Sequence, residues 1–500
     1  MKKLFLISFA SLFSAALLVN ADTDQQGLTI GNFKDYERIT YPVPLIRGTY
    51  TCPRKDYNNF NDVPEVFVKN ETTGRTIKGT GLSRRYKVWP ELVYGTNTLT
   101  VTVKTKERTE SNQIRLIYER PETDYLCYVY YMVDKNGDHI YISNLDKEKD
   151  PQYKDSELWR KKFVTGLKLM QSFTGDSMYR LGYPRKCFAL NCDESGDVIV
   201  TVVTSQYTKA EVCAWKREDG SFDEGKLYAH FCDILGPDRK GGEFRRALGI
   251  PNMASFVDGK VSGNTALGGY YLGQFGATGL YSWPASLDEV VQCFTNNTPI
   301  TTSLNDSCWR DVQYGHAATT LGAYMHEGGH GFGLPHIEGD KYNSVMARSY
   351  DIMNRCFTSW ENPTKRTPEV TFFDERDEPV WSRIECHILS SVPFFNEIKG
   401  SVPRTPPTYE LDEDGDTIRI HDDDGLVLVS YWGLKYKVLD TPNCHMYPLD
   451  GSVKDATLSL KQMRAAMQTE EKFEMKFWDK YGNQSSPVIT KDGKPSHFWD

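Results

Sequence analysis

Between about residues 41 and 119, apolar and polar residues alternate in short runs that are separated by turn-forming Asn, Gly and Pro. The clearest runs lie at 66–68, 99–103 and 114–118. A period of two places every second side chain on the same face of a strand. We therefore expect an antiparallel β-sandwich of about 100 residues in this part of the chain.

The pattern changes at about Asp124, where strands and helices begin to mix. Apolar runs at 128–133 and 198–203 predict two further strands. Between them, a helix is expected to follow a cap at Asp155 or Ser156. Its apolar residues fall on one stripe: Trp159, Phe163, Leu167, Met170 and Phe173.

Two features divide the rest of the chain. Ser286 and Glu289 have the spacing of a capping box, which predicts the start of another helix. Further on, three prolines in a polar stretch indicate a linker: Pro403, Pro406 and Pro407. Apolar runs at 418–429 and an alternating run at 473–477 then predict a second β-rich module.

These patterns predict an α+β chain with flanking β modules. The expected parts are a signal peptide at 1–21, an N-terminal β-sandwich module at 22–122, a mixed domain at 123–403 and a C-terminal, β-sandwich-like module at 404–500. At roughly 150 residues per domain, the length of 500 residues agrees with about three folded parts.

The first residues predict export. Lys2 and Lys3 precede an apolar run at 4–18, and residues 19–21 offer small side chains at the positions that a signal peptidase reads. Cleavage after Ala21 would start the mature chain at Asp22. The apolar run is short of the about 20 residues that a membrane span needs, and no later stretch is long and apolar enough either. We expect a secreted, extracellular protein without a membrane span.

The charge balance limits the classes of partner that we expect the chain to bind. The chain has 59 Lys and Arg against 67 Asp and Glu, for a formal net charge of −8. Such a balance disfavours DNA, RNA or an anionic membrane as the main partner.

Acidic turns at 412–416 and 422–425 lack the full spacing of a calcium loop, so we interpret them as solvated loops.

Export would allow both disulfides and glycosylation. The chain has 11 cysteines without a CxxC pair, so several disulfides are expected, with Cys293–Cys308 as the favoured single pair. Four Asn-x-Ser/Thr sequences would mark surface loops of a glycoprotein if the host glycosylates: Asn70, Asn296, Asn305 and Asn483.

The strongest chemical signal is a run of histidines at 326–336. On a helix, His326 and His330 project from the same face and can share one metal ion. Glu327 lies beside them and can take a proton from a water molecule. Gly333 can adopt a left-handed backbone that ends the helix and returns His336 as the third ligand. The fourth coordination position then stays open, which is typical of catalytic zinc.

The full pattern is far more specific than its first half. In a chain with 10 His and 39 Gly, the expected number of chance matches to H-E-x-x-H-x-x-G-x-x-H is on the order of 2 × 10⁻⁵. Lone histidines elsewhere are interpreted as structural: His230, His316 and His387.

This eleven-residue pattern resembles the metzincin clan of zinc endopeptidases. The resemblance implies a twisted sheet, an active-site helix, three Zn²⁺ ligands (His326, His330 and His336) and Glu327 as the general base. It also implies a methionine in a tight turn beneath the zinc. Met346 and Met353 are the candidates, and we favour Met346.

A narrower likeness joins residues 344–357 and 280–284 to a family of secreted and fungal metallopeptidases. In that family the protease domain is sometimes joined to a lectin domain. The likeness spans about residues 125–395. Neither candidate methionine is followed two residues later by Tyr, so the switchable tyrosine ligand of astacin-like members is not expected.

The sequence therefore predicts a secreted zinc endopeptidase that hydrolyses peptide bonds in protein or peptide substrates. Two alternatives stay open. One is a catalytically inactive, metzincin-like protein whose β modules attach to a glycan or another cell-surface ligand. The other is a zinc amidase that uses the same site on small amides.

Overall fold

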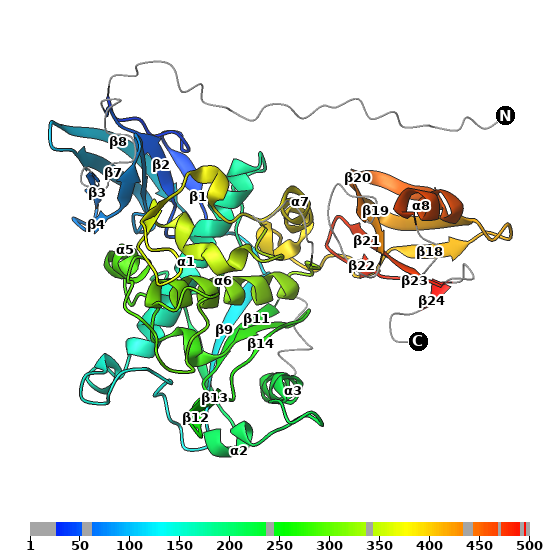
Figure 1. Cartoon of the computed structure of the whole chain (residues 1–500). Helices are drawn as coiled ribbons and strands as arrows, with labels where there is room; N and C mark the ends of the chain where they lie inside the picture. The colour runs from blue at the N-terminus through cyan, green and yellow to red at the C-terminus, as the bar shows by residue number, and fades with distance from the viewer. Residues whose placement is uncertain are drawn as a thin grey trace.

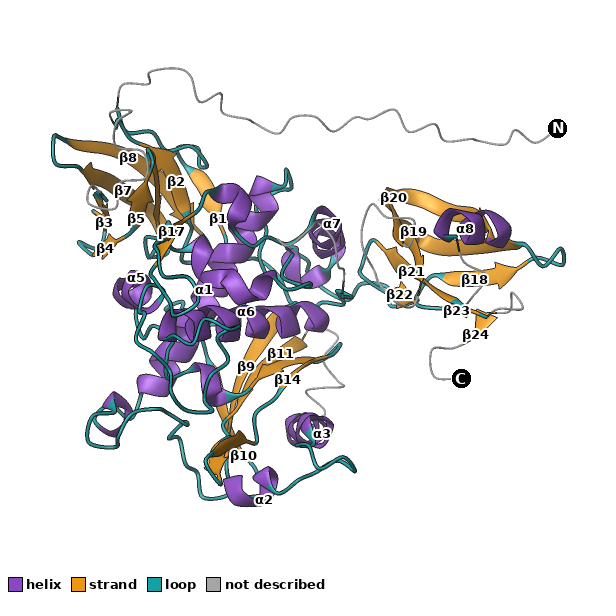
Figure 2. Ribbon diagram, in the orientation of Figure 1, coloured by secondary structure: helices purple, strands orange, loops and turns teal. Residues whose placement is uncertain are grey.

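The computed structural model describes residues 27–52, 63–236, 245–336, 344–433, 444–468, 472–490 and 495–496. The predicted signal peptide at 1–21 lies outside these residues. The fold is mixed α+β with several separate sheets, as the sequence predicts (Figures 1 and 2). In the described part of the chain, no helix combines the length and the apolar character that a membrane crossing requires.

The N-terminal region contains two sheets. The larger has the order β1-β8-β7-β3-β4 and the smaller the order β2-β6-β5. Their strands are β1 (Glu37–Ile39), β2 (Ile46–Thr49), β3 (Glu65–Asn70), β4 (Thr76–Lys78), β5 (Thr80–Leu82), β6 (Arg85–Val88), β7 (Gly95–Lys104) and β8 (Thr109–Tyr118). The predicted runs at 66–68, 99–103 and 114–118 lie on β3, β7 and β8, and their alternate residues are buried.

The central region is built on a five-stranded sheet with the order β10-β9-β11-β15-β14. The strands are β9 (Leu126–Val133), β10 (Val200–Thr204), β11 (Arg245–Pro251), β14 (Ala266–Gly268) and β15 (Leu272–Phe275). All neighbours run parallel except β14, which is antiparallel to β15 at one edge. The predicted strands at 128–133 and 198–203 correspond to β9 and β10.

Helices cover both faces of this sheet. The side chains of Val129 and Tyr131 pack toward the main core, which includes α1 (Leu158–Arg180) and α6 (Gln313–Gly331). Tyr130 and Met132 point to the other face, where α2 (Lys209–Cys213) and α3 (Glu224–Leu235) lie. Because both faces are buried, β9 is apolar along nearly its whole length instead of alternating.

Shorter elements complete the central region: β12 (Ser255–Val257), β13 (Lys260–Ser262), α5 (Val290–Cys293), β16 (Trp360–Glu361), β17 (Thr371–Phe372) and α7 (Arg383–Ser391). The 3₁₀ segments are η3 (Pro151–Tyr153), η4 (Ala277–Gly279), η5 (Leu287–Glu289), η6 (Ser349–Cys356), η7 (Glu375–Asp377) and η8 (Pro393–Phe395). The predicted capping box at Ser286 is wrong. Its side chain makes no cap, and only η5 and the short α5 follow.

The C-terminal region differs from the predicted sandwich. Its described strands form one antiparallel sheet, and the helix α8 (Leu460–Met467) packs on that sheet as the second layer. The strands are β18 (Thr408–Leu411), β19 (Thr417–Gly433), β20 (Cys444–Ser459), β21 (Phe473–Asp479), β22 (Gln484–Ser485), β23 (Val488–Ile489) and β24 (Pro495–Ser496). The amphipathic helix, whose Leu460, Met463 and Met467 are buried, replaces a second sheet.

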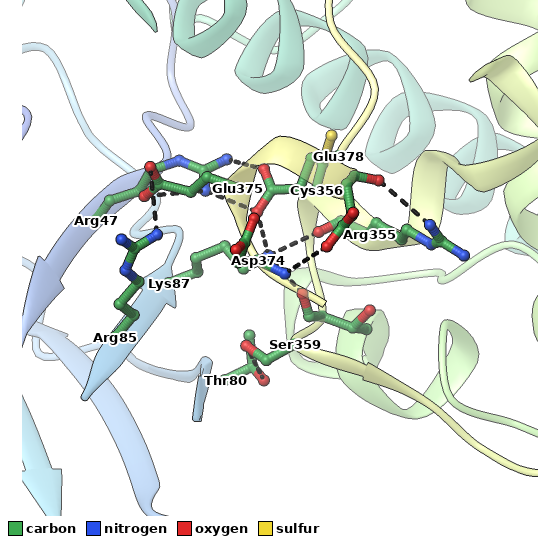
Figure 3. A network of polar contacts seen from close by, with 12 residues as sticks. Arg47, Thr80, Arg85, Lys87, Arg355, Cys356, Ser359, Asp374, Glu375 and Glu378 are labelled. Carbon is green, nitrogen blue, oxygen red and sulfur yellow. Dashed lines mark hydrogen bonds and ion pairs between the residues drawn. The ribbon is translucent and has the colours of Figure 1, made fainter. Parts of the chain in front are cut away.

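A buried ionic cluster joins the N-terminal strands to the central region (Figure 3). Arg47 of β2 pairs with Asp176 of α1 at 2.8 Å and with Glu378 at 2.7 Å. Lys87 of β6 reaches the same Glu378 at 2.8 Å, and Arg180 reaches it at 3.1 Å. Burial opposes the charge on Glu378, but the surrounding cations Arg47, Lys87 and Arg180 outweigh it and lower its pKa to about 2.

The prediction of disulfides is wrong for this structure. No disulfide joins the described residues, and Cys293 and Cys308 are both free thiols. Several buried sulfurs lie instead close to backbone carbonyls. Cys213 Sγ is 3.5 Å from Met253 O, and Cys356 Sγ is 3.8 Å from Pro379 O. Each of these thiols is therefore packed as a small apolar group with a weak hydrogen bond.

The glycosylation sequences do not all lie in surface loops either. Asn70 and Asn483 are buried, with 2% and 9% of their surface exposed. The Asn70 amide donates to Glu91 O and to Asn97 Oδ1, and the Asn483 amide donates to Pro403 O. These two side chains are engaged inside the fold and are not available to carry a glycan.

Candidate metal centre

The histidine run lies where the sequence predicts it, at the C-terminal end of α6. The helix ends at Gly331, and Gly333 follows with a φ of +87°. Gly333 N donates to His330 O at 2.9 Å, and Leu334 N donates to Gly329 O at 3.0 Å. This left-handed turn reverses the chain and brings His336 back toward the helix.

The three imidazoles converge on one point. His336 Nε2 is 3.1 Å from His326 Nε2 and 3.1 Å from His330 Nε2. One ligand atom from each ring lies within 4.8 Å of the others. Two nitrogens that bind one tetrahedral zinc at its usual bond lengths are about 3.4 Å apart. The spacing therefore fits a single small cation.

The opposite ring nitrogens fix the tautomers. His326 Nδ1 lies 2.9 Å from Val345 O, and His330 Nδ1 lies 2.9 Å from Leu334 O. A carbonyl can only accept, so each Nδ1 carries the proton and each Nε2 presents a lone pair to the common point. Lone pairs in contact at this distance repel one another unless a cation lies between them. A divalent metal ion fits this donor set, and three neutral imidazoles are typical zinc ligands.

Burial supports the neutral state of the first ligand. His326 is 7% exposed, and burial, followed by the charge of His330, lowers its pKa to about 3. The imidazole is therefore a free base over the physiological range. His330 is half-buried and His336 is exposed, so the cluster opens toward solvent on one side.

Glu327 lies beside the cluster under the edge of the central sheet. It is 8% exposed, and burial, with a smaller contribution from the charge of Glu224, raises its pKa to about 8. The edge strand β14 passes very close. A Cβ added at Gly268 would lie 2.9 Å from Glu327 Oε2 and 2.8 Å from His330 Cβ. Gly268 thus allows the strand edge to approach the carboxylate.

Met346 is buried below the helix, in the tight turn that the resemblance implies. Ala347 N donates to Ser344 O, and Met346 N donates to Ser344 Oγ at 3.0 Å. The Met346 sulfur would be 2.5 Å from a Cβ added at Gly329, between the two helical histidines. The alternative candidate, Met353, lies farther along in η6.

Sequence reasoning missed three partners of the site. Val345 O and Leu334 O set the histidine tautomers, and backbone carbonyls leave no signal in residue type. Tyr350 was missed as well, and its ring packs edge-on against His326 with centroids 5.2 Å apart. Only its closeness in sequence to the methionine turn could have marked it.

The lone histidines are held by protein groups, as expected of structural residues. His316 is fully buried, with Nδ1 2.8 Å from Ser282 Oγ, and His230 Nε2 is 2.8 Å from Ser205 Oγ. The acidic turns are less uniform. Asp422 is buried and lies with Asp424 and Asp479 in a second group of carboxylates, so its interpretation as a solvated loop residue is wrong.

Comparisons with known proteins agree with a metal-dependent peptidase. Residues 28–430 match the model of a family described as "Putative peptidase family". A "putative zinc metalloproteinase" of Saccharomyces cerevisiae is 31% identical over 262 residues, which cover 46% of this chain and 36% of the relative. One of Schizosaccharomyces pombe is 30% identical over 291 residues, which cover 52% of this chain and 44% of the relative.

The chain thus spans less than half the length of these two curated relatives. Among solved structures, OgpA from Akkermansia muciniphila in complex with an O-glycopeptide is 15% identical. The alignment covers 74% of this chain and 93% of that chain, with a TM-score of 0.45.

Proposed function

This chain belongs to the peptidase family whose model its residues 28–430 match, and we propose that it is a secreted, zinc-dependent endopeptidase of the metzincin clan. One observation carries the proposal. The Nε2 atoms of His326, His330 and His336 converge on one point, with Glu327 next to them. Both fungal relatives bear the name zinc metalloproteinase, which supports zinc as the metal.

His326, His330 and His336 would hold a zinc ion, which would supply Lewis acidity toward the scissile carbonyl and toward water. Glu327 accepts the proton of the attacking water and then donates it to the nitrogen of the leaving amine. A carboxyl group beside the three imidazoles is placed to make both transfers. Tyr350 holds the His326 ring from the side.

The edge of the central sheet offers a place for an extended peptide. β14 ends the described strand order and is paired only with β15, and residues 266–268 are half-buried. An extended peptide can add to such an edge through backbone hydrogen bonds. Gly268 would then bring the scissile bond close to Glu327.

Two further features support the metzincin assignment. The spacing of the ligands follows the eleven-residue pattern, with the left-handed Gly333 in its turn. Met346 lies against the helix between the ligands. The proposal of secretion rests on the leader at 1–21 alone, because no disulfide joins the described residues. N-terminal sequencing of protein from the culture medium should find Asp22 first.

The test combines metal analysis with a cleavage assay. The purified chain should contain about one zinc per molecule and cleave denatured casein, and a chelator should abolish the cleavage until zinc is restored. Stoichiometric zinc without chelator-sensitive cleavage would favour the surface-binding alternative. Turnover of small amides without cleavage of casein or unblocked peptides would favour the amidase. Absence of zinc would contradict the metal centre itself.

A further inference from the structure

The turn between the second and third histidines is held from outside the matched family region. Gln484 lies on β22 of the C-terminal sheet, beyond residue 430, where the family match ends. Its side-chain amide Nε2 donates to Gly333 O at 3.1 Å. A residue 151 positions away in sequence therefore contacts the turn that brings His336 to the metal centre.

This turn also determines the tautomer and the orientation of the His330 side chain. The residue after Gly333 is Leu334, whose carbonyl accepts the hydrogen bond from His330 Nδ1. A shift of the Gly333 peptide would tilt that carbonyl and change both the orientation of His330 and the return path of His336. Partners of this kind orient metal ligands and raise their basicity.

The close approach of Gln484 depends on the glycine. A Cβ added at Gly333 would lie 2.0 Å from Gln484 Nε2. The positive φ of +87° favours glycine, and the end of the Gln484 side chain occupies the space where a Cβ would lie. The turn and the C-terminal side chain therefore fit each other sterically as well as through the hydrogen bond.

The C-terminal sheet is docked firmly enough to act as a support. β22 pairs with β21, and the neighbouring Asn483 Nδ2 donates to Pro403 O at 2.9 Å. His387 of α7 contacts Val427 O and Leu449 O of that sheet at 2.8 and 3.0 Å. Buried residues of the sheet, including Trp432 and Trp478, belong to the main hydrophobic core.

We propose that Gln484 is a positioning residue of the zinc centre, through which the C-terminal sheet stabilises the turn between His330 and His336. This inference rests on the proposed function, because it assumes that the histidines bind zinc. Gln484 touches neither substrate nor metal, and its effect passes through the Gly333 and Leu334 peptides.

The test measures zinc affinity of the full-length chain by competition with a chromophoric chelator. Gln484→Ala removes the whole contact, whereas Gln484→Met keeps the length of the side chain and removes its amide. Ser485→Ala is the matched control, because Ser485 Oγ donates to Pro407 O and also joins β22 to the rest of the chain without reaching the turn. Melting of the zinc-free proteins checks that all three variants fold.

Both Gln484 variants should bind zinc about tenfold more weakly, at the lower end of the effect of residues behind metal ligands, while KM for a peptide substrate stays near the wild-type value. The Ser485→Ala protein should stay within about twofold of wild type. Wild-type affinity in Gln484→Met, or an equal loss in Ser485→Ala, would overturn the inference alone. Failure of the wild-type chain to bind zinc would overturn the proposed function, and the inference with it.

Discussion

At the scale of single residues, the site separates the groups that hold the metal from the group that moves the proton. His326, His330 and His336 converge through their Nε2 atoms, and Glu327 projects from the same helix under β14. Replacing Glu327 should therefore leave metal binding intact, whereas replacing a histidine should remove the metal and the activity that depends on it.

Glu327→Ala should keep zinc bound and lower kcat by about 10² to 10⁴, the usual contribution of a positioned acid or base. The change removes the proton acceptor and leaves the three imidazoles in place. Zinc content and peptide turnover are measured on the same preparation. His330→Ala is the control and should lose both metal and activity. Near-normal hydrolysis by Glu327→Ala would show that another group is the base.

The histidines and the glutamate could be predicted from the sequence because their spacing along a helix determines which side chains share a face. The groups behind them could not. Val345 O and Leu334 O are backbone atoms, and Gln484 reaches the turn from a distant strand. Such partners depend on tertiary packing, which leaves no local pattern.

At the scale of elements, α6 contains several glycines, which are unusual in a helix interior. Each glycine costs roughly 1 kcal/mol relative to Ala in a helix interior. Gly322 is required, since a Cβ there would lie 2.0 Å from the backbone oxygen of Tyr350. Gly328 is not required for packing, because its nearest neighbour, Leu248 Cδ2, would be at an ordinary 3.4 Å.

Gly322→Ala should therefore destabilise the chain by about 1 to 3 kcal/mol, because η6 must move away from the helix. Gly328→Ala, in the same helix, should be neutral or stabilising by up to about 1 kcal/mol. Urea unfolding of both variants checks the difference. Equal stabilities would mean that η6 does not pack against α6 as described.

Strands with a clear alternation were predicted well, as β3, β7 and β8 show. Elements whose ends depend on tertiary contacts were not. Ser286 and Glu289 have the spacing of a capping box, yet Glu289 accepts from Ala285 N and leaves Ser286 without a capping bond. The runs at 418–420 and 426–429 belong to one long strand, β19, which a polar turn sequence at 422–425 obscured.

At the scale of the whole molecule, the ionic cluster around Glu378 makes the junction of the N-terminal and central regions sensitive to acid. The pKa of Glu378 is lowered from 4.5 to about 2 in the folded chain. Its contribution to stability is therefore complete above about pH 4.5 and is lost as the pH falls from there toward 2.

Glu378→Gln should lower the free energy of unfolding at neutral pH by about 3 to 5 kcal/mol, because Arg47 and Lys87 lose their buried partner. The difference in the free energy of unfolding between Glu378→Gln and wild type should become smaller as the pH falls from 4.5 toward 2. Denaturant unfolding at a series of pH values measures both effects.

The matched control is Glu397→Gln, which breaks the contact of Glu397 with the more exposed Arg38 across the same junction. It should cost no more than about 1 kcal/mol at any pH. A gap for Glu378→Gln that does not change between pH 4.5 and 2 would contradict the assignment of this acid sensitivity to Glu378.

The contacts between distant parts of the chain could be predicted least well from the sequence. The coarse α+β class follows from the patterns, but nothing local indicates that Arg47 meets Asp176 and Glu378, which lie far from it along the chain. The same holds for the single C-terminal sheet and for cysteines that are packed without bridges. The predicted boundaries at 122 and 403 stay predictions.

The ionic cluster around Glu378 also limits how far the chain can be shortened. Excising residues 123–403 as a minimal catalytic fragment would remove Arg47 and Lys87 and leave the carboxylates of Asp176 and Glu378 with Arg180 but without those two cations. The smallest autonomous piece must consequently retain β2 and β6, so the stretch that carries the chemistry is shorter than the stretch that can fold.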